Sequence, residues 1–147
     1  SAHGVRVVRL RIAPVLAPKG GMLARLVPPF KLGLGGRLGS GQQWMPWIHL
    51  DDLVTLFDHL LQRDDAQGAF NACAPEVVRN SDFTRTLGKV LRRPTLLPAP
   101  AWALRLALGE MSVLLLGGQH LQPQRTQSGG FDWRYPRLEP ALTALLR

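Results

Sequence analysis

One helical pattern lies between two strand-like runs, and this alternation constrains the fold more than any other feature of the chain. Residues 5–12 are rich in β-branched side chains and alternate apolar residues with arginine, which predicts a strand. Asp51 and Asp52 occupy the expected N-cap of a helix whose apolar residues recur every three or four positions. Gly68 is expected to end that helix, and residues 69–74 form a small-residue strand. The order predicts an α/β fold.

The rest of the chain divides into further helical and extended runs. Residues 22–27 form a short predicted helix that Pro28 and Pro29 should stop. Asn80, Ser81 and Asp82 cap a second long helix. The remaining expectations are a strand at 95–97, a helix at 101–116, an extended segment at 124–133 and a closing helix at 138–146.

Composition places the chain among globular proteins. Of its 147 residues, 46% are hydrophobic and 19% charged, which is enough for one domain with a core and excludes a disordered chain. The formal net charge is +8, but the cations are spread along the sequence without a basic block. Binding to nucleic acid is therefore not favoured.

The cysteine content and the hydropathy of the chain indicate the cellular compartment in which it is expected. Cys73 is the only cysteine, so an internal disulfide and a multi-cysteine zinc site are excluded, and a reduced, cytoplasmic location is expected. The most apolar stretch, residues 96–118, is interrupted by prolines and charges, so we expect no membrane span.

A loop with five glycines in residues 33–41 invites comparison with a dinucleotide-binding turn. Gly33, Gly35 and Gly39 have one spacer too many, and the loop lacks a preceding strand and a following helix. We therefore interpret it as a surface loop or the rim of a site.

His49 stands just before the predicted helix start, in the segment 47–53. A nearby carboxylate could accept its ring N–H and fix its tautomer, which favours a structural role over a catalytic one. No second histidine or cysteine lies at metal-ligand spacing, so no metal site is predicted.

Several segments together resemble one protein family. Residues 39–43 and 47–53 are similar to the G-x-G-x-Q…[FW]-[IV]-H-[IV]-x-D-[LV] segment of extended short-chain dehydrogenases/reductases, the NAD-dependent epimerase/dehydratase group. Residues 11–16, 29–36, 71–75, 80–84 and 130–136 resemble its nucleoside-diphosphate-sugar epimerase subfamily often labelled cell-division-inhibitor-like. The resemblance implies a Rossmann-type fold of which residues 1–147 are a single, C-terminal, substrate-side segment, with the N-terminal dinucleotide-binding half absent.

The family's catalytic Tyr-x-x-x-Lys pair is missing from these residues. Tyr135 is the only tyrosine, and Glu139 follows four positions later. The resemblance thus implies the substrate-binding part of an NAD(P)-dependent epimerase or oxidoreductase that is not catalytic alone. NAD or NADP would belong to the intact protein, with none expected on this chain alone.

The resemblance also assigns site residues. The backbone after the first strand approaches the nicotinamide in the family, which maps onto Ala13, Pro14 and Val15. The substrate pocket maps onto the following segment, at Gln43, Trp44, Met45, Trp47 and His49. An arginine of better-known sugar-nucleotide epimerases is missing here, which indicates a more apolar substrate. The two tryptophans are equally compatible with the hydrophobic core.

Two alternatives remain open from the sequence. The chain could be a non-catalytic basic module that binds an acidic partner or nucleic acid, as its charge of +8 allows. A homo-oligomer is the other alternative, because strand 5–12 would expose an open edge without the missing half.

Overall fold

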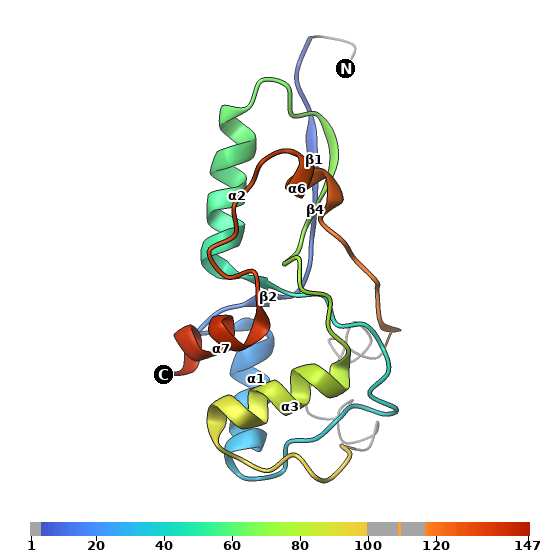
Figure 1. Ribbon diagram of the computed structural model, residues 1–147, viewed down its shortest axis with the longest axis vertical. Coiled ribbons are helices and arrows are strands. Elements are labelled where there is room, and N and C mark those ends of the chain that lie inside the picture. Colours follow the sequence, from blue (N-terminus) through green and yellow to red (C-terminus); the bar gives the residue numbers. More distant parts are fainter. Residues whose placement is uncertain (1–3, 100–108, 110–116) are drawn as a thin grey trace.

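The structure is a computed structural model that describes residues 4–99, 109 and 117–147 (Figure 1). Its elements are β1 (Val8–Ile12), β2 (Val15–Leu16), α1 (Gly21–Lys31), β3 (Ile48–His49), α2 (Leu50–Gln62), β4 (Gly68–Ala72), α3 (Asn80–Leu91), α6 (Gln124–Ser128) and α7 (Leu138–Leu146). The predicted α/β class is confirmed. The expected helix at 101–116 lies outside the described residues, apart from Gly109.

The main sheet pairs β1 with β4 in parallel. The register runs from Val8 opposite Gly68 to Ile12 opposite Ala72. This confirms two predicted strands, with the first starting three residues later than expected. Gly68 begins β4 rather than ending the helix, and its φ of +83° suits glycine.

The two edges of this sheet differ in what covers them. Along β4, the guanidinium of Arg125 donates to the Ala69 carbonyl at 2.8 Å, and the Thr126 hydroxyl donates to the Asn71 carbonyl at 3.0 Å. Helix α6 therefore covers that edge. Along β1, no second strand is paired within the described part of the chain. The edge of β1 opposite β4 is left without a strand partner there.

Buried apolar side chains form two clusters. The sheet cluster lies between α2 and the β1–β4 pair and contains Ile48, Leu53, Leu56, Leu60, Ala66, Phe70, Ala72 and Phe131. The helical cluster lies among α1, α3 and α7, in the lower part of Figure 1, and contains Leu16, Met22, Leu23, Leu26, Phe30, Leu38, Met45, Trp47, Ala74, Val78, Phe83, Leu87, Val90, Leu138, Ala141 and Leu142. The short parallel pair β2–β3 joins the two parts.

Helix α1 continues through both prolines, so the predicted stop at Pro28 is wrong. A proline ring fits helical φ, and its cost is the lost N–H and the crowding of the preceding turn. Burial compensates here, because Leu26 and Phe30 are 6% and 4% exposed in the helical cluster. The Leu32 and Leu34 amides then bond to the two proline carbonyls at 3.2 and 2.9 Å.

We expect Pro28→Ala to raise the free energy of unfolding by about 1–2 kcal/mol. Pro28 is exposed, so little packing is lost, and alanine restores a donor for the Ala24 carbonyl one turn earlier. Urea-induced unfolding measures the change. Pro136→Ala, in an exposed non-helical position, is the matched control and should be neutral or slightly destabilising. Equal effects of the two substitutions would contradict the account.

Two expectations about helix N-caps are corrected. The N-cap of α2 is His49, so Asp51 and Asp52 lie in the first turn instead. The N-cap of α3 is Arg79, and Asn80 is inside the helix, where its side chain accepts the Leu38 amide at 2.7 Å. The side chains of Asp52 and Asn80 make tertiary contacts instead of capping their helices. The sequence pattern alone does not distinguish a capping side chain from one with such a contact.

The extended segment expected at 124–133 is also wrong at its start, because α6 is a helical turn. The Gln127 amide bonds to the Pro123 carbonyl at 2.8 Å, and buried Thr126 secures the turn on β4. Residues 95–97 form no strand, although Ala99 makes an isolated parallel bridge to Leu38. Among the described residues, no helix is long and apolar enough to cross a membrane.

Candidate functional site

The predicted cofactor residues lie where β1 ends and β2 begins. The Ala13 amide donates to the Ala72 carbonyl at 3.0 Å, and the Pro14 carbonyl accepts the Ile48 amide at 3.1 Å. Val15 pairs with Ile48 in the β2–β3 ladder. Ala13 is only 2% exposed. Ala13 and Pro14 directly follow the carboxyl end of β1, the usual place for ligands in parallel sheets.

The predicted substrate segment runs beside the start of α3. The Met45 amide donates to the Val78 carbonyl, and the Asn80 amide donates to the Gln43 carbonyl, both at 2.9 Å. Gln43 and Trp44 are partly exposed, whereas Met45 and Trp47 are 2% and 1% exposed in the helical cluster. In this chain, Gln43 and Trp44 are therefore the members of the segment that a ligand can reach.

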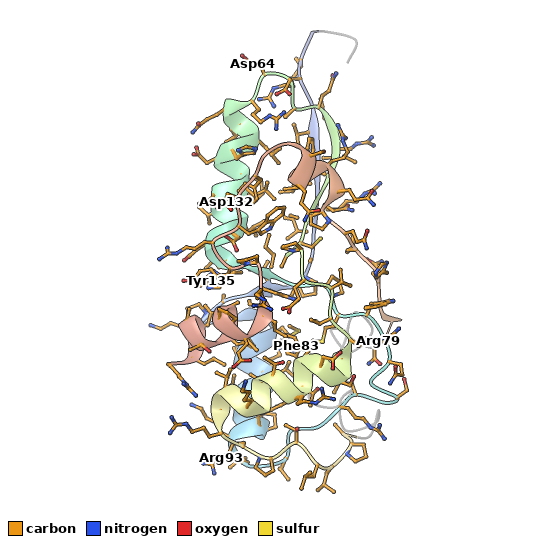
Figure 2. The ribbon with its side chains drawn as sticks, viewed as in Figure 1. Asp64, Arg79, Phe83, Arg93, Asp132 and Tyr135 are labelled. Carbon is orange, nitrogen blue, oxygen red and sulfur yellow. The ribbon has the colours of Figure 1, made fainter. Side chains whose placement is uncertain are left out.

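Trp44 has charged and aromatic neighbours that the sequence did not indicate. The Arg79 guanidinium lies 4.2 Å from the centroid of its ring, and the His120 ring lies 4.5 Å from it. Arg79, at the start of α3 in Figure 2, also donates to the Gln42 carbonyl. These residues are 35 and 76 positions beyond Trp44, so no local spacing could have found them. Together they present a cationic, aromatic surface.

His49 is held as a structural group between the two clusters. Its Nδ1 accepts the Asp51 amide at 3.0 Å, which caps α2, and its ring stacks on Tyr135 at a centroid distance of 3.9 Å. The expected contact, a carboxylate accepting the ring N–H, is not made: Nδ1 is an acceptor, and Asp51 Oδ2 is 3.9 Å away. Nε2 is buried and has no hydrogen-bond partner within the described part of the chain.

The pKa of His49 is lowered from its usual value, mainly because burial disfavours the imidazolium, although Asp51 and Asp52 act in the opposite direction. The folded chain therefore binds fewer protons here than the unfolded chain. The free energy of unfolding should be highest above the unfolded pKa of 6.5 and fall as the pH drops toward the lower folded pKa. We expect His49→Asn, which keeps a capping side chain but does not titrate, to remove this part of the pH dependence.

Urea unfolding of both proteins between about pH 5 and pH 8 measures the difference. Because the two proteins differ only at position 49, the difference between their pH profiles isolates His49. Identical slopes for the two proteins would show that His49 is not buried in its neutral form.

Asp52 is the buried carboxylate that the sequence assigned wrongly to a cap. It is 1% exposed, and its two oxygens accept the amides of Arg134 and Tyr135 at 2.8 and 3.0 Å. The tail before α7 is thereby fixed to the first turn of α2, near Tyr135 in Figure 2. A carboxylate within an otherwise apolar helix face was the available sequence signal, but its partners are more than 80 residues away.

The described residues offer little for metal or thiol chemistry. Among them, no group of three or more His, Cys, Asp or Glu side chains is placed to hold a metal ion. Cys73 is buried, and burial raises the pKa of its thiol to about 11. The thiol is therefore protonated at neutral pH and packs as a small apolar side chain.

The structure groups the predicted site residues into two sets. Ala13, Pro14 and Val15 lie next to Ile48 and His49 through the β2–β3 pair. Gln43 and Trp44 lie next to Arg79 at the start of α3. Trp47 separates the two sets in the sequence and is buried, with its carbonyl bonded to the Ala74 amide at 2.7 Å.

Comparisons with known proteins agree with this architecture. Residues 1–73 match the NAD dependent epimerase/dehydratase family, and residues 99–145 match a domain of unknown function, DUF1731. The chain is 43% identical over 143 residues to the "Epimerase family protein SDR39U1 homolog, chloroplastic" of Arabidopsis thaliana, covering 97% of this chain and 41% of that protein.

Two solved structures are similar over nearly the whole chain. The crystal structure of human epimerase family protein SDR39U1 (isoform2) with NADPH has a TM-score of 0.88 and 36% identity, covering 95% of this chain and 48% of that one. The nucleoside-diphosphate sugar epimerase from Corynebacterium glutamicum has a TM-score of 0.73 and 29% identity, covering 97% of this chain and 26% of that one.

The chain spans about half the length of the curated relatives it matches. Its strands and helices form the Rossmann-like α/β arrangement of the epimerase structures. Both the matched segments and the fold agree with the resemblance of its 39–43 and 47–53 motifs. The chain belongs to the NAD-dependent epimerase/dehydratase family, and its relatives there include the epimerase family proteins SDR39U1.

Proposed function

We propose that residues 1–147 are the substrate-side segment of an NAD(P)-dependent, epimerase-like oxidoreductase whose nucleotide-binding half lies in another part of the protein. In this proposal the chain binds substrate and contributes backbone to the cofactor site, while the catalytic acid/base comes from the other half. Relatives about twice as long support it, and so does the human relative solved with NADPH. The observation that carries it is the edge of β1 without a strand partner in the described chain.

The exposed edge of β1 is accompanied by exposed apolar side chains. Val5, Val7 and Ile12 are 62%, 55% and 49% exposed on or just before that strand. A parallel sheet is normally buried on both faces and continues beyond two strands. Since α6 covers β4, the sheet can be extended only beside β1.

Helix α2 has a second apolar face beside the one that packs on the sheet. Leu50, Val54, Phe57 and Leu61 recur at helical spacing and are 38%, 59%, 45% and 71% exposed. A helix with two apolar faces fits a position between two packed layers. We assign this exposed face to a helix of the nucleotide-binding half, on the same side of the extended sheet.

Within the proposed enzyme, Ala13, Pro14 and Val15 contact the nicotinamide end of the cofactor, because they directly follow β1, the strand nearest the missing half. Gln43 and Trp44 contact the substrate, while Met45, Trp47 and His49 shape the wall behind them. An exposed indole beside Arg79 favours a substrate that combines a flat apolar part with negative charge.

Cofactor binding by the complete gene product tests the proposal. We expect the complete protein to enhance NADPH fluorescence on binding and the isolated 147-residue chain to leave it unchanged. Ala13→Leu should weaken binding at least about tenfold, because the buried backbone beside the nicotinamide has no room for the side chain. Absence of binding to both NADH and NADPH in the complete protein would refute the oxidoreductase assignment.

The interface is tested by co-expressing residues 1–147 with the remainder of the gene product. We expect the two pieces to co-purify, and Val54→Lys to abolish co-purification because it places a charge in the apolar face. Gln62→Lys adds the same charge at an exposed position beyond that face and is the control. Co-purification that survives Val54→Lys would show that the exposed face of α2 is not the contact.

A further inference from the structure

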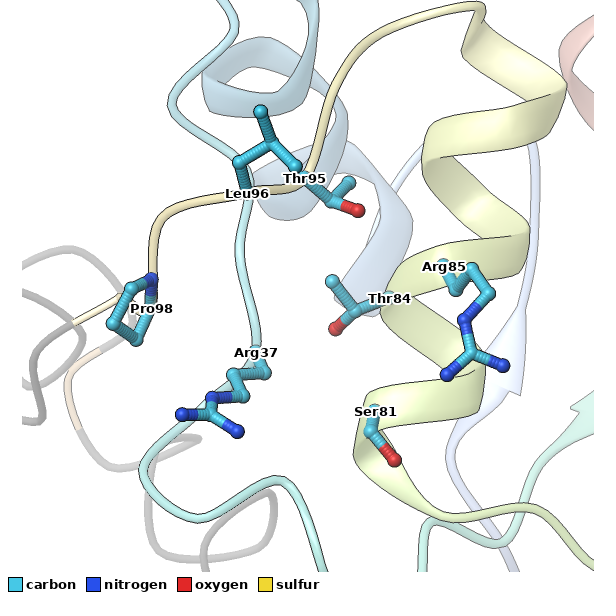
Figure 3. A pocket seen from close by; sticks show the side chains of 7 residues that line it. All are labelled: Arg37, Ser81, Thr84, Arg85, Thr95, Leu96 and Pro98. Atoms are coloured by element: carbon cyan, nitrogen blue, oxygen red, sulfur yellow. The ribbon is translucent and has the colours of Figure 1, made fainter.

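A pocket lies between the glycine-rich loop and α3, and no site residue discussed above lines it. Its volume is about 240 Å³, and it is lined by Arg37, Ser81, Thr84, Arg85, Thr95, Leu96 and Pro98 (Figure 3). That volume is room for about eight water molecules. The lining combines two guanidinium groups and three hydroxyl groups with an apolar wall of Leu96 and Pro98.

The loop side of the pocket is held rigidly. The Arg37 carbonyl accepts the Ala99 amide at 2.9 Å, and the next amide, of Leu38, donates to Asn80 at 2.7 Å. At Gly36 a Cβ would overlap the Leu97 carbonyl, so the chain can approach this closely only with glycine. The backbone of Arg37 is therefore fixed on both sides, and its position relative to the pocket is set by the fold.

The side chain of Arg37 has no internal role in the described part of the chain. None of its guanidinium nitrogens makes a hydrogen bond or ion pair there, and in Figure 3 the side chain leaves the loop at the pocket with its guanidinium on the side away from α3. Arg85 pairs with Asp82 at 3.3 Å, but it is 77% exposed, and such a pair is weak. Most donors of both guanidinium groups remain available to a ligand.

The hydroxyl of Thr84 is a second group, unpaired among the described residues, that lines the pocket. The residue is 4% exposed and lines the pocket, and its hydroxyl makes no hydrogen bond within the described chain, so this donor is open to a ligand in the pocket. Figure 3 shows this hydroxyl on the pocket side of α3, facing the loop that carries Arg37. Ser81 adds a hydroxyl one turn earlier. The helix amides themselves are not available, because those of Ser81 and Asp82 bond to the Gly41 and Arg79 carbonyls.

We propose that this pocket binds the phosphate group of a small phosphorylated molecule. The two guanidinium groups and three hydroxyls that line the pocket are donors that match the several acceptor oxygens of a phosphate. The volume exceeds that of a phosphate alone, and the organic part of the ligand contacts Leu96 and Pro98. The proposal concerns binding and is independent of the oxidoreductase assignment.

Calorimetric titration of the complete gene product at low ionic strength tests the site, with inorganic phosphate and glycerol 3-phosphate as probes. We expect glycerol 3-phosphate to bind with a Kd of about 1 mM or below and several times more tightly than phosphate. Arg37→Gln should weaken that binding about tenfold, and Thr84→Val, which keeps the shape of the side chain, at least about threefold.

Arg137→Gln is the control, because Arg137 is exposed at the start of α7 and its loss changes the net charge by the same amount. Equal losses of glycerol 3-phosphate affinity in Arg37→Gln and Arg137→Gln would show that only the net charge of the protein matters. That result would overturn the assignment of the site to this pocket. Equal affinity for the two probes would limit the pocket to free phosphate and overturn the organic part of the ligand. Absence of binding by either probe to a folded protein would overturn the proposal entirely.

Discussion

Asp52→Ala is expected to lower the free energy of unfolding by about 3–4 kcal/mol. The substitution removes a buried carboxylate that accepts the amides of Arg134 and Tyr135 and leaves both amides without a partner. Tyr135 also stacks on His49, so the loss extends to the cap of α2. The change should appear as a lower midpoint of urea-induced unfolding.

Two further variants separate hydrogen bonding from charge. Asp52→Asn keeps one acceptor in the same shape and should lose about half as much. Asp58→Ala removes a carboxylate from the exposed side of the same helix, where its one partner among the described residues is Gln62 at 2.7 Å, and should change stability by less than about 0.5 kcal/mol. Similar losses for Asp52→Ala and Asp58→Ala would show that Asp52 does not hold the tail.

Trp47→Ala is expected to cost about 3–5 kcal/mol of stability, and Trp44→Ala about 1 kcal/mol. The two residues are three positions apart, but Trp47 is 1% exposed in the helical cluster, whereas Trp44 is partly exposed between Arg79 and His120. Truncation of Trp47 leaves a large cavity in a packed core. Truncation of Trp44 removes mainly a surface contact.

Thermal and urea unfolding of both variants give the comparison. Trp47→Phe keeps an aromatic ring and should recover most of the loss, since the Nε1 of Trp47 has no hydrogen-bond partner in the described chain. In the proposed enzyme, Trp44→Ala should change KM for the substrate while leaving NADPH binding unaltered. Equal destabilisation by Trp44→Ala and Trp47→Ala would mean that the division of the segment into core and surface is wrong.

The elements that the sequence predicted well are those whose packing is decided locally. The closing helix is confirmed at its predicted residues, 138–146, and the helix before Pro94 is confirmed with its start at Asn80, inside the expected cap. The α/β class followed from the alternation of such elements.

The predictions that failed depend on contacts with distant residues. A pair of prolines normally stops a helix, but the burial of Phe30 keeps α1 intact past them. The turn of α6 depends on hydrogen bonds from Arg125 and Thr126 to β4, more than 50 residues earlier. Tertiary contacts of this kind outweigh local propensity and leave no periodic pattern in the sequence.

In the candidate site too, the sequence predicted the locally determined features and missed those that depend on distant contacts. Motif resemblance located Ala13, Pro14 and Val15 at strand ends, which the structure places beside Ile48. It could not distinguish Trp44 from Trp47, since burial depends on how α1 and α3 pack around the segment. Arg79, Asp52 and the pocket at Arg37 depend on neighbours brought together only by the fold.

Residues of the sheet cluster and of the helical cluster follow one another closely in the sequence, often one or two positions apart. Val15 packs on the sheet cluster and Leu16 belongs to the helical cluster; Trp47 and Ile48 are divided in the same way, as are Ala72 and Ala74. A single peptide cleavage therefore cannot separate the molecule into two pieces that each keep a whole core. A segment of this fold that is transferred between genes therefore keeps both cores only if it carries both parts together.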